Sequence, residues 1–564
     1  MRKLIRKKSI ESILSSHENL SENHQLNRNL TVTDLTAFGI AAVIGAGIFS
    51  TIGKACFSGG PGVVFLFIFT AIASGFTAMC YAEFASRIPV SGSAYTYAYV
   101  SFGEVFAWII GWALIMEYSI GNIAVAISWS EYFLSLLRNL GLFIPDWLTI
   151  DYGSAQRAFE QNLKTTYASA WTTAPMIGSL RIIFNLPATM INILITIVVY
   201  IGIKESKTLS NLMVLLKVIV ILLVIGIGFF FVDGANWNPF MPNGFSGVMA
   251  SVSSVFFAYI GFDAISTTAE ECRNPKRDLP RGMFYSLAIC TILYILLALV
   301  LTGMIPYTNL DVGDPLAFVF NERGLNWIGG VISISAIVAM TSVLLVFQMG
   351  QPRIWMSMSR DGLMPKKFSE IHPTYKTPSF ATIVTGFVVA IPLFFFDYNF
   401  IIDFTSISTL FAFVLVCAGT LLLPKAEKDS TKFSLPWIPA RIMMPIGCTG
   451  LLLWGCTLGS HHFSELFHLL PEDKEFSLFG VNIFSYADEN VRKISLVIFY
   501  IICIGMTILS VLKNYTLIPV LGLLSCLYLL TSMNIHNWIY FLIWMLIGLG
   551  IYLGYSQKRS KLHS

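Results

Sequence analysis

Long apolar runs recur along the whole chain and restrict its fold more than any other feature. Runs of about 20 apolar residues match the hydrocarbon thickness of a bilayer. Only 12% of the residues are charged and 55% are hydrophobic, whereas a soluble domain carries about 25% charged residues. The mean hydropathy is +0.71. The sequence therefore predicts an all-α integral membrane protein, because only helices or closed barrels satisfy their backbone groups in lipid.

The apolar runs predict about fourteen transmembrane helices between two cytoplasmic tails, residues 1–31 and 556–564. The first tail is polar and basic and lacks the apolar stretch of a signal peptide. The expected spans lie near 32–53, 61–85, 104–138, 187–203, 209–232, 246–266, 282–304, 327–352, 379–397, 400–423, 441–458, 493–512, 515–532 and 535–555.

The basic residues indicate the orientation. With the N-terminus inside, 26 of the 36 Lys and Arg fall in cytoplasmic segments, 9 fall in external segments, and Lys217 lies within a span. Such an excess is what the positive-inside rule expects of a correct topology. Both termini are therefore expected in the cytoplasm. The net charge of +4 reflects this orientation and predicts no nucleic-acid partner.

No catalytic or metal site is expected. His461-His462, in the long external loop 459–492, could ligate a metal, but no second ligand pair stands at metal-site spacing. The nine cysteines lie mostly in apolar spans and are interpreted as small core residues. No nucleophile–base pair occurs within the spans. The sequence therefore predicts a protein that is not an enzyme.

Glycines interrupt the first and the sixth span. The first contains Gly45 and Gly47, and the sixth contains Gly261 followed by Phe262 and Asp263. Close helix packing would explain single glycines. Two interrupted helices five spans apart instead fit an inverted five-plus-five repeat with a binding site near the midplane. The opened first helix would offer N–H groups to a carboxylate, and the opened sixth would offer carbonyls to an ammonium group.

Lys217 and Glu117 are the ionisable residues deepest in the expected spans. Such residues are functional candidates by default. Lys217 could release and regain a proton, which would make H⁺ the driving ion; alternatively, its stem could reach the cytoplasmic interface. Glu117 could be a proton relay, a contact for a cationic side chain or a structural partner, and these alternatives stay open. Asp263 could cap or gate the sixth helix.

Several ordered motifs resemble the amino acid–polyamine–organocation superfamily, and within it the cationic amino acid transporter-type permeases. The resemblance covers about residues 10–425. The motifs are Leu30–Leu35, Ile44–Phe49, Pro89–Tyr97, Phe256–Ala264, Thr267–Glu271, Asn274–Pro280, Gly350–Arg353, Ser359–Pro365 and Thr377-Pro378.

The resemblance implies a LeuT-like fold and a location in the plasma (inner) membrane. The first inverted repeat would span 32–232 (helices 1–5) and the second 246–423 (helices 6–10). Helices 11–14 would occupy 441–555, with the loop 459–492 outside; the extra pair of spans resembles the longer, fourteen-helix members.

The resemblance also implies roles for single residues. Ile44, Gly45, Ala46 and Gly47 would meet the substrate carboxylate. The amine would meet Phe257, Ala258 and Ile260, and Phe257 would also close the site from outside. Lys217 matches the lysine of proton-coupled bacterial members. The resemblance places Phe347 or Gln348 near the side-chain pocket, and Glu117 is a further pocket candidate because of its depth in the third span.

The expected function is proton-coupled amino acid uptake by alternating access, with neutral substrates favoured over cationic ones. Amino acid exchange on the same fold is the alternative. A channel or receptor is less favoured, because the chain shows no filter repeat, voltage-sensor series or signalling domain. No cofactor is expected besides the driving ion. The expected partners are the amino acid and the lipid bilayer, and the oligomeric state and any accessory subunit are left open.

Overall fold

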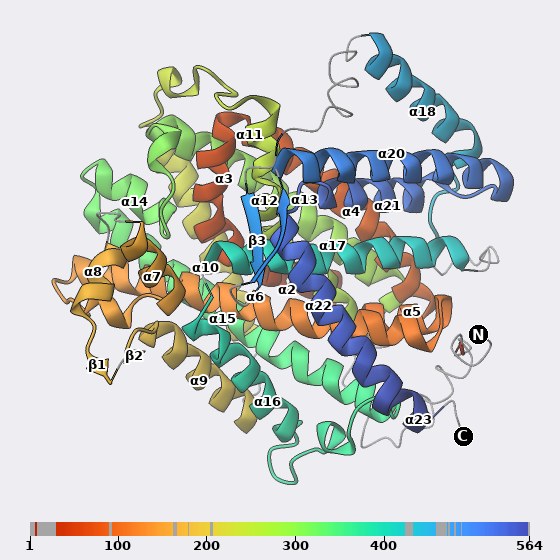
Figure 1. The fold of residues 1–564 in the computed structure, drawn as a ribbon, viewed down its shortest axis with the longest axis horizontal. Helices are drawn as coiled ribbons and strands as arrows, with labels where there is room; N and C mark the ends of the chain where they lie inside the picture. The colour runs from red at the N-terminus through yellow and green to blue at the C-terminus, as the bar shows by residue number, and fades with distance from the viewer. Residues whose placement is uncertain are drawn as a thin grey trace.

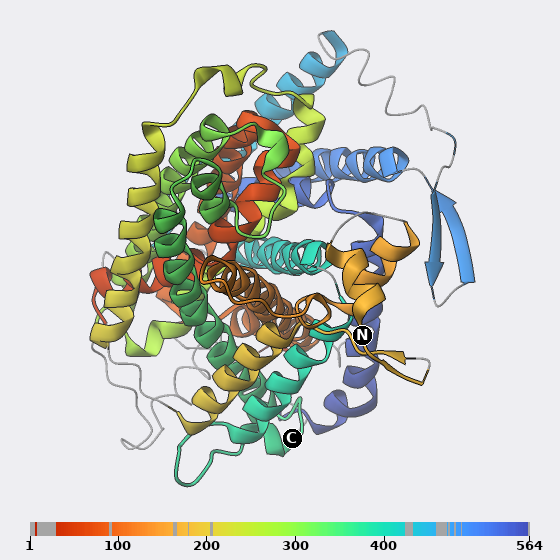
Figure 2. The same ribbon diagram turned by 90° about the vertical axis from the view of Figure 1, so that its left-hand side faces the viewer.

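The described part of the protein is mostly helical (Figures 1 and 2). The computed structural model describes residues 6–7, 30–88, 93–161, 166–178, 180–202, 207–396, 398–423, 433–457, 471, 474–478, 481–486 and 488–561. His461-His462, most of the N-terminal tail and the first four residues of the Pro89–Tyr97 motif lie outside these ranges. The expected all-α class is confirmed.

A helix lies in each range in which the apolar runs predict a span. The helices are α2 (Val32–Val43) with α3 (Ile52–Gly59), α4 (Val63–Arg87), α6 (Glu104–Asn139), α9 (Leu186–Ile201), α10 (Lys207–Phe229), α11 (Gly244–Ala250) with α12 (Val252–Phe257), α13 (Pro275–Met304), α15 (Asn326–Arg360), α16 (Ser379–Ala390), α17 (Tyr398–Leu422), α18 (Ala440–Thr457), α20 (Asp488–Lys513), α21 (Leu517–Leu530) and α22 (Ile535–Ile551).

Length and composition support a multi-pass membrane protein. Within the described residues, eight helices are long and apolar enough to cross a bilayer, or nine if the bent pair α11–α12 forms one span. Shorter apolar helices such as α2, α9 and α21 fall below the length of a full span. The number of fourteen spans stays a prediction.

The centre of the molecule is formed by α6, which packs against α15 and α17, while α13 packs against α2 and α4. Nearly all of the apolar stretch of α6 is buried. Small residues permit this close packing: a Cβ at Gly350 of α15 would lie 2.5 Å from the ring of Tyr118 of α6. Membrane helices approach closely where such residues meet.

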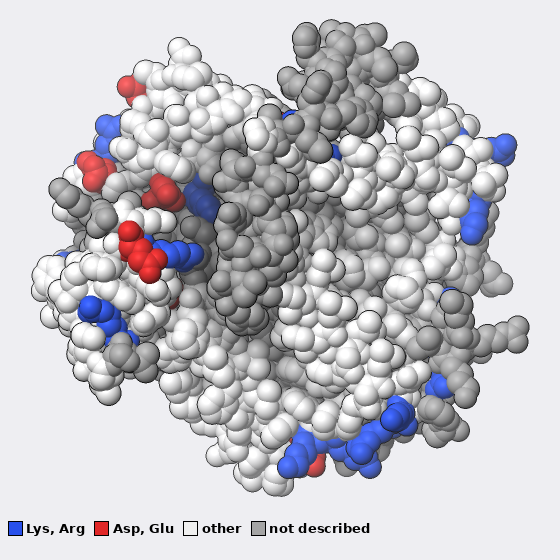
Figure 3. Space-filling model, in the orientation of Figure 1, with Lys and Arg blue, Asp and Glu red and all other residues white. Residues whose placement is uncertain are grey.

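The surface shows the charge distribution of a membrane protein (Figure 3). Most of the visible surface is uncharged; Lys and Arg gather along its lower edge, and acidic and basic residues mix at its left. The uncharged part is apolar on α20, where Ile494, Ile498 and Ile501 are more than half exposed. Such side chains would be costly to expose to water and suit contact with lipid.

The segment 139–186 contains short elements around a small core. These are α7 (Tyr152–Glu160), α8 (Thr166–Thr173) and a hairpin of β1 (Met176–Ile177) and β2 (Leu180–Arg181). Its core includes Ile150, Ala155, Ala170 and Ile183. A second antiparallel hairpin, β3 (Lys474–Leu478) with β4 (Val481–Tyr486), lies in the other long loop.

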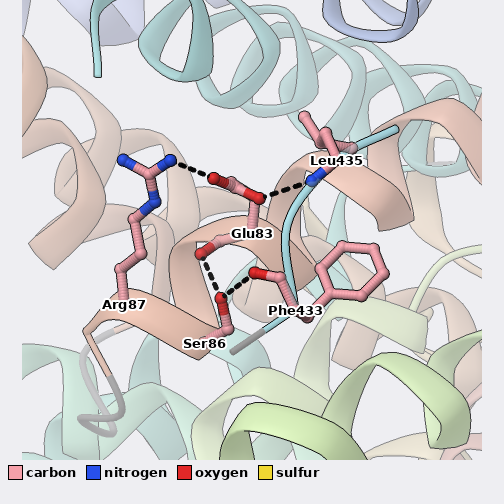
Figure 4. Close-up of polar contacts among 5 residues, drawn as sticks. All are labelled: Glu83, Ser86, Arg87, Phe433 and Leu435. Atoms are coloured by element: carbon pink, nitrogen blue, oxygen red, sulfur yellow. Dashed lines mark hydrogen bonds and ion pairs between the residues drawn. The ribbon is translucent and has the colours of Figure 1, made fainter. Parts of the chain in front are cut away.

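The chain that follows α17 is attached to the end of α4 (Figure 4). Glu83, one turn before the end of α4, forms an ion pair with Arg87 and accepts a hydrogen bond from the backbone N–H of Leu435 at 2.8 Å. The hydroxyl of Ser86 donates to the carbonyl of Phe433 at 2.8 Å. These contacts hold the segment that leads to α18 against the first half of the chain.

Candidate functional site

The first of the two interrupted helices is broken at Ile44–Ala46. α2 ends at Val43, Ile44 is extended (φ −79°, ψ 94°), and the helix resumes as a π-helical turn, Gly47–Thr51, that leads into α3. The N–H groups of Ile48 and Phe49 both donate to the carbonyl of Gly45 at 3.1 Å. The N–H groups at the start of this π-helical turn form a helix N-terminus, which carries partial positive charge.

The second break follows α12. The N–H groups of Tyr259 and Ile260 donate to carbonyls three residues earlier, at 2.9 and 3.3 Å, so the α-helical pattern is lost. Gly261 then adopts φ 109°, a conformation that glycine tolerates and other residues avoid. The chain continues as a 3₁₀ helix, Phe262–Glu271. α11 and the segment that begins with α12 are bent by 43°.

The two breaks touch each other. A Cβ at Gly47 would lie 2.4 Å from the Cα of Ala258, and one at Gly261 would lie 2.9 Å from the carbonyl oxygen of Ala42. A Cβ at a third glycine, Gly45, would lie 2.8 Å from the side chain of Val343 of α15. Segments about 200 residues apart in the sequence therefore meet at glycines, because larger side chains would separate them.

A small cavity lies between the two breaks. Its lining residues are Ala42, Val43, Gly45, Ala46 and Gly47 of the first break, Phe257 and Ile260 of the second, Val125 of α6, and Val343 and Phe347 of α15. Every lining side chain is apolar, so the polar groups of this site come from the backbone. The lining is suited to an apolar group, and the backbone groups of the two breaks lie beside it.

The structure places some of the expected site residues in the cavity lining and the others outside it. Gly45, Ala46, Gly47, Phe257, Ile260 and Phe347 line the cavity. Ala258 lies outside the lining, against Gly47, and Ile44 directs its carbonyl toward Lys217.

Gln348 also lies outside the lining. Its side chain bonds to Asn122 of α6 and donates to the hydroxyl of Thr196 of α9 at 2.9 Å. The sequence did not predict that Val125 and Val343 line the cavity. In an apolar helix, no sequence signal distinguishes a valine that faces a cavity from one that faces lipid.

Lys217 is fully buried at the broken end of α2. Its Nζ donates to the carbonyl oxygens of Ala41 at 3.0 Å and Ile44 at 3.1 Å. These carbonyls belong to the last turn of α2, which has no further helical N–H groups to bond. The ammonium therefore lies at the break and not at the cytoplasmic interface.

Glu117 lies in a separate buried polar group. Its side chain lies close to Thr409 of α17 and close enough to Asp263 for the two carboxyl groups to interact. Both residues are almost completely buried. Among the described residues, the Oε2 atom of Glu117 has no hydrogen-bond partner. Glu117 does not line the cavity.

Comparison with known proteins agrees with this architecture. A model of the amino acid permease family matches residues 30–461, and a model of the C-terminus of these permeases matches residues 515–560. The branched-chain amino acid permease BcaP of Bacillus subtilis (strain 168) is 36% identical over 99% of this chain and 99% of its own length.

Two other relatives are similar over most of the chain. The methylthioribose transporter of Bacillus subtilis (strain 168) is 41% identical over 80% of this chain and 92% of its own length. The vacuolar cationic amino acid transporter 4 of Arabidopsis thaliana is 35% identical over 77% of this chain and 69% of its own length.

Proposed function

The chain belongs to the amino acid permease family, and its relatives are transporters and not enzymes; from this premise we propose that it is a secondary active amino acid transporter. The observation that carries the proposal is the contact between the two broken helices around an apolar cavity. The N–H groups after the first break would bind the substrate carboxylate, and the carbonyls at the second would bind its ammonium group.

In this proposal the chain has a LeuT-like fold of two inverted repeats. Transport then follows from rocking of one group of helices against the other around a fixed site. Phe257, on the second break and in the cavity lining, would close the site from outside. The protein would lie in the plasma (inner) membrane with both termini in the cytoplasm.

A neutral, aliphatic amino acid is the favoured substrate. The apolar lining supports this choice, because a cationic side chain there would lose its hydration without meeting a carboxylate. The substrates for which BcaP is named, branched-chain amino acids, are also neutral and aliphatic. Cationic amino acids are the less favoured substrates, since Glu117 lies outside the lining.

Methylthioribose is a second candidate, because the transporter named for it is 41% identical to this chain. A thioether would also suit the apolar lining. A sugar, however, carries neither the carboxylate nor the ammonium group that two broken helix ends can bind. The amino acid is therefore preferred.

Lys217 would couple transport to protons. Its ammonium occupies the broken end of α2, where a sodium-coupled relative would hold a cation, and its burial supports reversible protonation during the cycle. H⁺ would then be the driving ion. Exchange of one amino acid for another is the alternative mode, because it needs the same site without net proton flow.

Uptake into proteoliposomes tests these statements. Vesicles with an inward proton gradient, with and without Na⁺, receive radiolabelled neutral and cationic amino acids, and methylthioribose serves as a competitor. We expect gradient-driven accumulation of aliphatic amino acids, lost in Lys217→Ala and not dependent on Na⁺.

Three outcomes would contradict parts of the proposal. Strict Na⁺ dependence would remove the role of Lys217. Transport only with amino acid preloaded inside would establish exchange. Inhibition by methylthioribose together with no uptake of any amino acid would favour the sugar.

A further inference from the structure

At the broken end of α2, each backbone carbonyl from Ile40 to Ile44 has a neighbouring group. The carbonyl of Ile40 accepts the N–H of Ile44 at 2.8 Å. Lys217 bonds to those of Ala41 and Ile44. The carbonyl of Ala42 lies against Gly261 of the second break.

The remaining carbonyl, that of Val43, is bound by a tyrosine. The hydroxyl of Tyr294, on α13, donates to it at 3.1 Å, and Tyr294 is fully buried. α2, α10 and α13 pack against one another. Two side chains from two neighbouring helices, Lys217 from α10 and Tyr294 from α13, thus bond consecutive carbonyls of one helix end.

Tyr294 is held firmly in this position. Its ring packs edge-on against Phe67 of α4 and Tyr259 of the second break, with ring centroids 5.9 and 5.5 Å apart. Its hydroxyl also lies close to the thiol of Cys290, one turn earlier on α13. Because this packing already fixes the ring, the hydroxyl can bond at the break with little further loss of rotamer freedom.

We propose that Tyr294 is a positioning residue for transport: its hydroxyl, together with the Lys217 ammonium, holds the broken end of α2 in its substrate-binding position. The two donors differ in one respect. The bonds of Lys217 weaken when the ammonium loses its proton, because charge-assisted hydrogen bonds are roughly twice as strong as neutral ones. The bond from the Tyr294 hydroxyl does not change with that step. This proposal rests on the proton-coupling role of Lys217 proposed above.

The surroundings of Lys217 contain few other groups that titrate. From α13 it faces Cys290 and Tyr294. The acidic residue of α2, Asp34, lies at the opposite end of that helix and bonds to Thr31. The basic residues of α15, Arg353 and Arg360, lie in its C-terminal part. The pH response at the break is therefore expected to come from Lys217.

Removal of the hydroxyl has a defined consequence. In Tyr294→Phe the Val43 carbonyl stays buried without its donor, which shifts the equilibrium between the held and released positions of α2 by about tenfold toward release. A higher proton concentration is then needed to restore the held position. The pH midpoint of substrate binding should move toward acidic pH, by up to about one unit for a tenfold change.

The experiment measures substrate protection of the full-length, detergent-solubilised protein against thermal unfolding from pH 5 to pH 9, with an aliphatic amino acid as ligand. Tyr552→Phe is the matched control. It removes a buried hydroxyl that lies on the turn after α22, outside the helices that form the two breaks, and that donates to Glu104 of α6 at 3.0 Å. We expect an acidic shift in Tyr294→Phe and a midpoint like that of the wild type in Tyr552→Phe.

Each other outcome has a distinct meaning. Equal midpoints in the two variants would overturn the role of Tyr294. A wild type whose binding does not vary with pH, and which shows no proton-driven uptake, would overturn the coupling role of Lys217 instead. If Tyr294→Phe does not fold, Tyr294→His, which retains a shorter donor, should show a smaller shift in the same direction, and an unchanged midpoint there also refutes the proposal.

Discussion

Gly47 is the residue at which the two broken helices come closest. A single added methyl group would meet the Cα of Ala258 at 2.4 Å, and neither backbone segment can rotate away as a side chain could. Overpacking of this kind costs about 1–3 kcal/mol. We expect Gly47→Ala to reduce uptake by about tenfold or more while the protein still folds.

Gly75 of α4 provides the control for this prediction. A Cβ at Gly75 has no neighbour within 4 Å, so Gly75→Ala should transport like the wild type. Initial uptake rates, normalised to the amount of folded protein in the vesicles, compare the two variants. Equal rates in Gly47→Ala and the wild type would show that the contact at Ala258 is not needed.

Asp314, in the loop before α14 (Pro315–Glu322), should make stability depend on pH. Burial raises the pKa of its carboxyl group from 3.8 to about 6, although a hydrogen bond from Ser135 and the charge of Arg138 oppose the change. The unfolded chain then releases this proton at lower pH than the folded protein does. Folding stability from this group is therefore present below about pH 4 and is lost as the pH rises toward 6.

Asp314→Asn should remove this loss. We expect the midpoint of thermal unfolding of the variant to fall less than that of the wild type between pH 4 and pH 6. Asp311→Asn, in the same loop but at an exposed position, should behave like the wild type. If the unfolding midpoint of Asp314→Asn falls between pH 4 and pH 6 as steeply as that of the wild type, the titrating group lies elsewhere.

At the scale of elements, the end of the chain is part of the packed structure. A π-helical turn, Tyr552–Ser556, and α23 (Gln557–Arg559) extend α22. The hydroxyls of Tyr552 and Ser560 both donate to Glu104 at the start of α6, at 3.0 and 2.6 Å. Ser556 donates to the carbonyl of Leu363, beyond α15, at 2.6 Å. The last turns thus connect α22 to two central helices.

Truncation after Ile551 should therefore lower the thermal unfolding midpoint by several degrees, because Glu104 and the Leu363 carbonyl would stay buried without these donors. Removal of residues 562–564 alone serves as the control and should leave the midpoint unchanged. Fluorescence-detected size-exclusion chromatography after heating measures both. A stable truncated protein would mean that these contacts contribute little.

The order of the helices and their approximate positions were predictable, because the length of an apolar run is matched to the bilayer. α6 begins at the expected Glu104, but α13 begins seven residues before the expected 282, and α15 ends eight residues after the expected 352. The 3₁₀ continuation after Gly261 and the hairpin β1–β2 were not predicted. Short elements of this kind depend on local hydrogen bonds and neighbours, and hydropathy carries no information on them.

For the whole molecule, the basic residues predict which face is cytoplasmic. Arg157 on α7 and Lys366 after α15 are both exposed, and the charge bias places them on opposite sides of the membrane. The described cysteines are buried or half-buried, so their background labelling should be low. In intact cells, a membrane-impermeant maleimide should label Arg157→Cys, and it should label Lys366→Cys only after permeabilisation. The reverse pattern would invert the orientation.

The sequence alone determined the class of the protein, the order of its apolar helices and the glycines at which two of them break. These features are local: they follow from apolar length, from charge placement and from the freedom of a residue without a side chain. The family resemblance came from the same ordered motifs and is confirmed by the match over residues 30–461.

Only the tertiary structure decided which groups meet. It brought Gly47 to Ala258, Val125 and Val343 to the cavity, and Tyr294 to the carbonyl of Val43, across separations of up to about 250 residues. It also placed Gln348 between α6 and α9 and outside the cavity. The rotation of a helix about its axis is set by packing against its neighbours, and in an apolar helix the sequence shows no polar face from which to read that rotation.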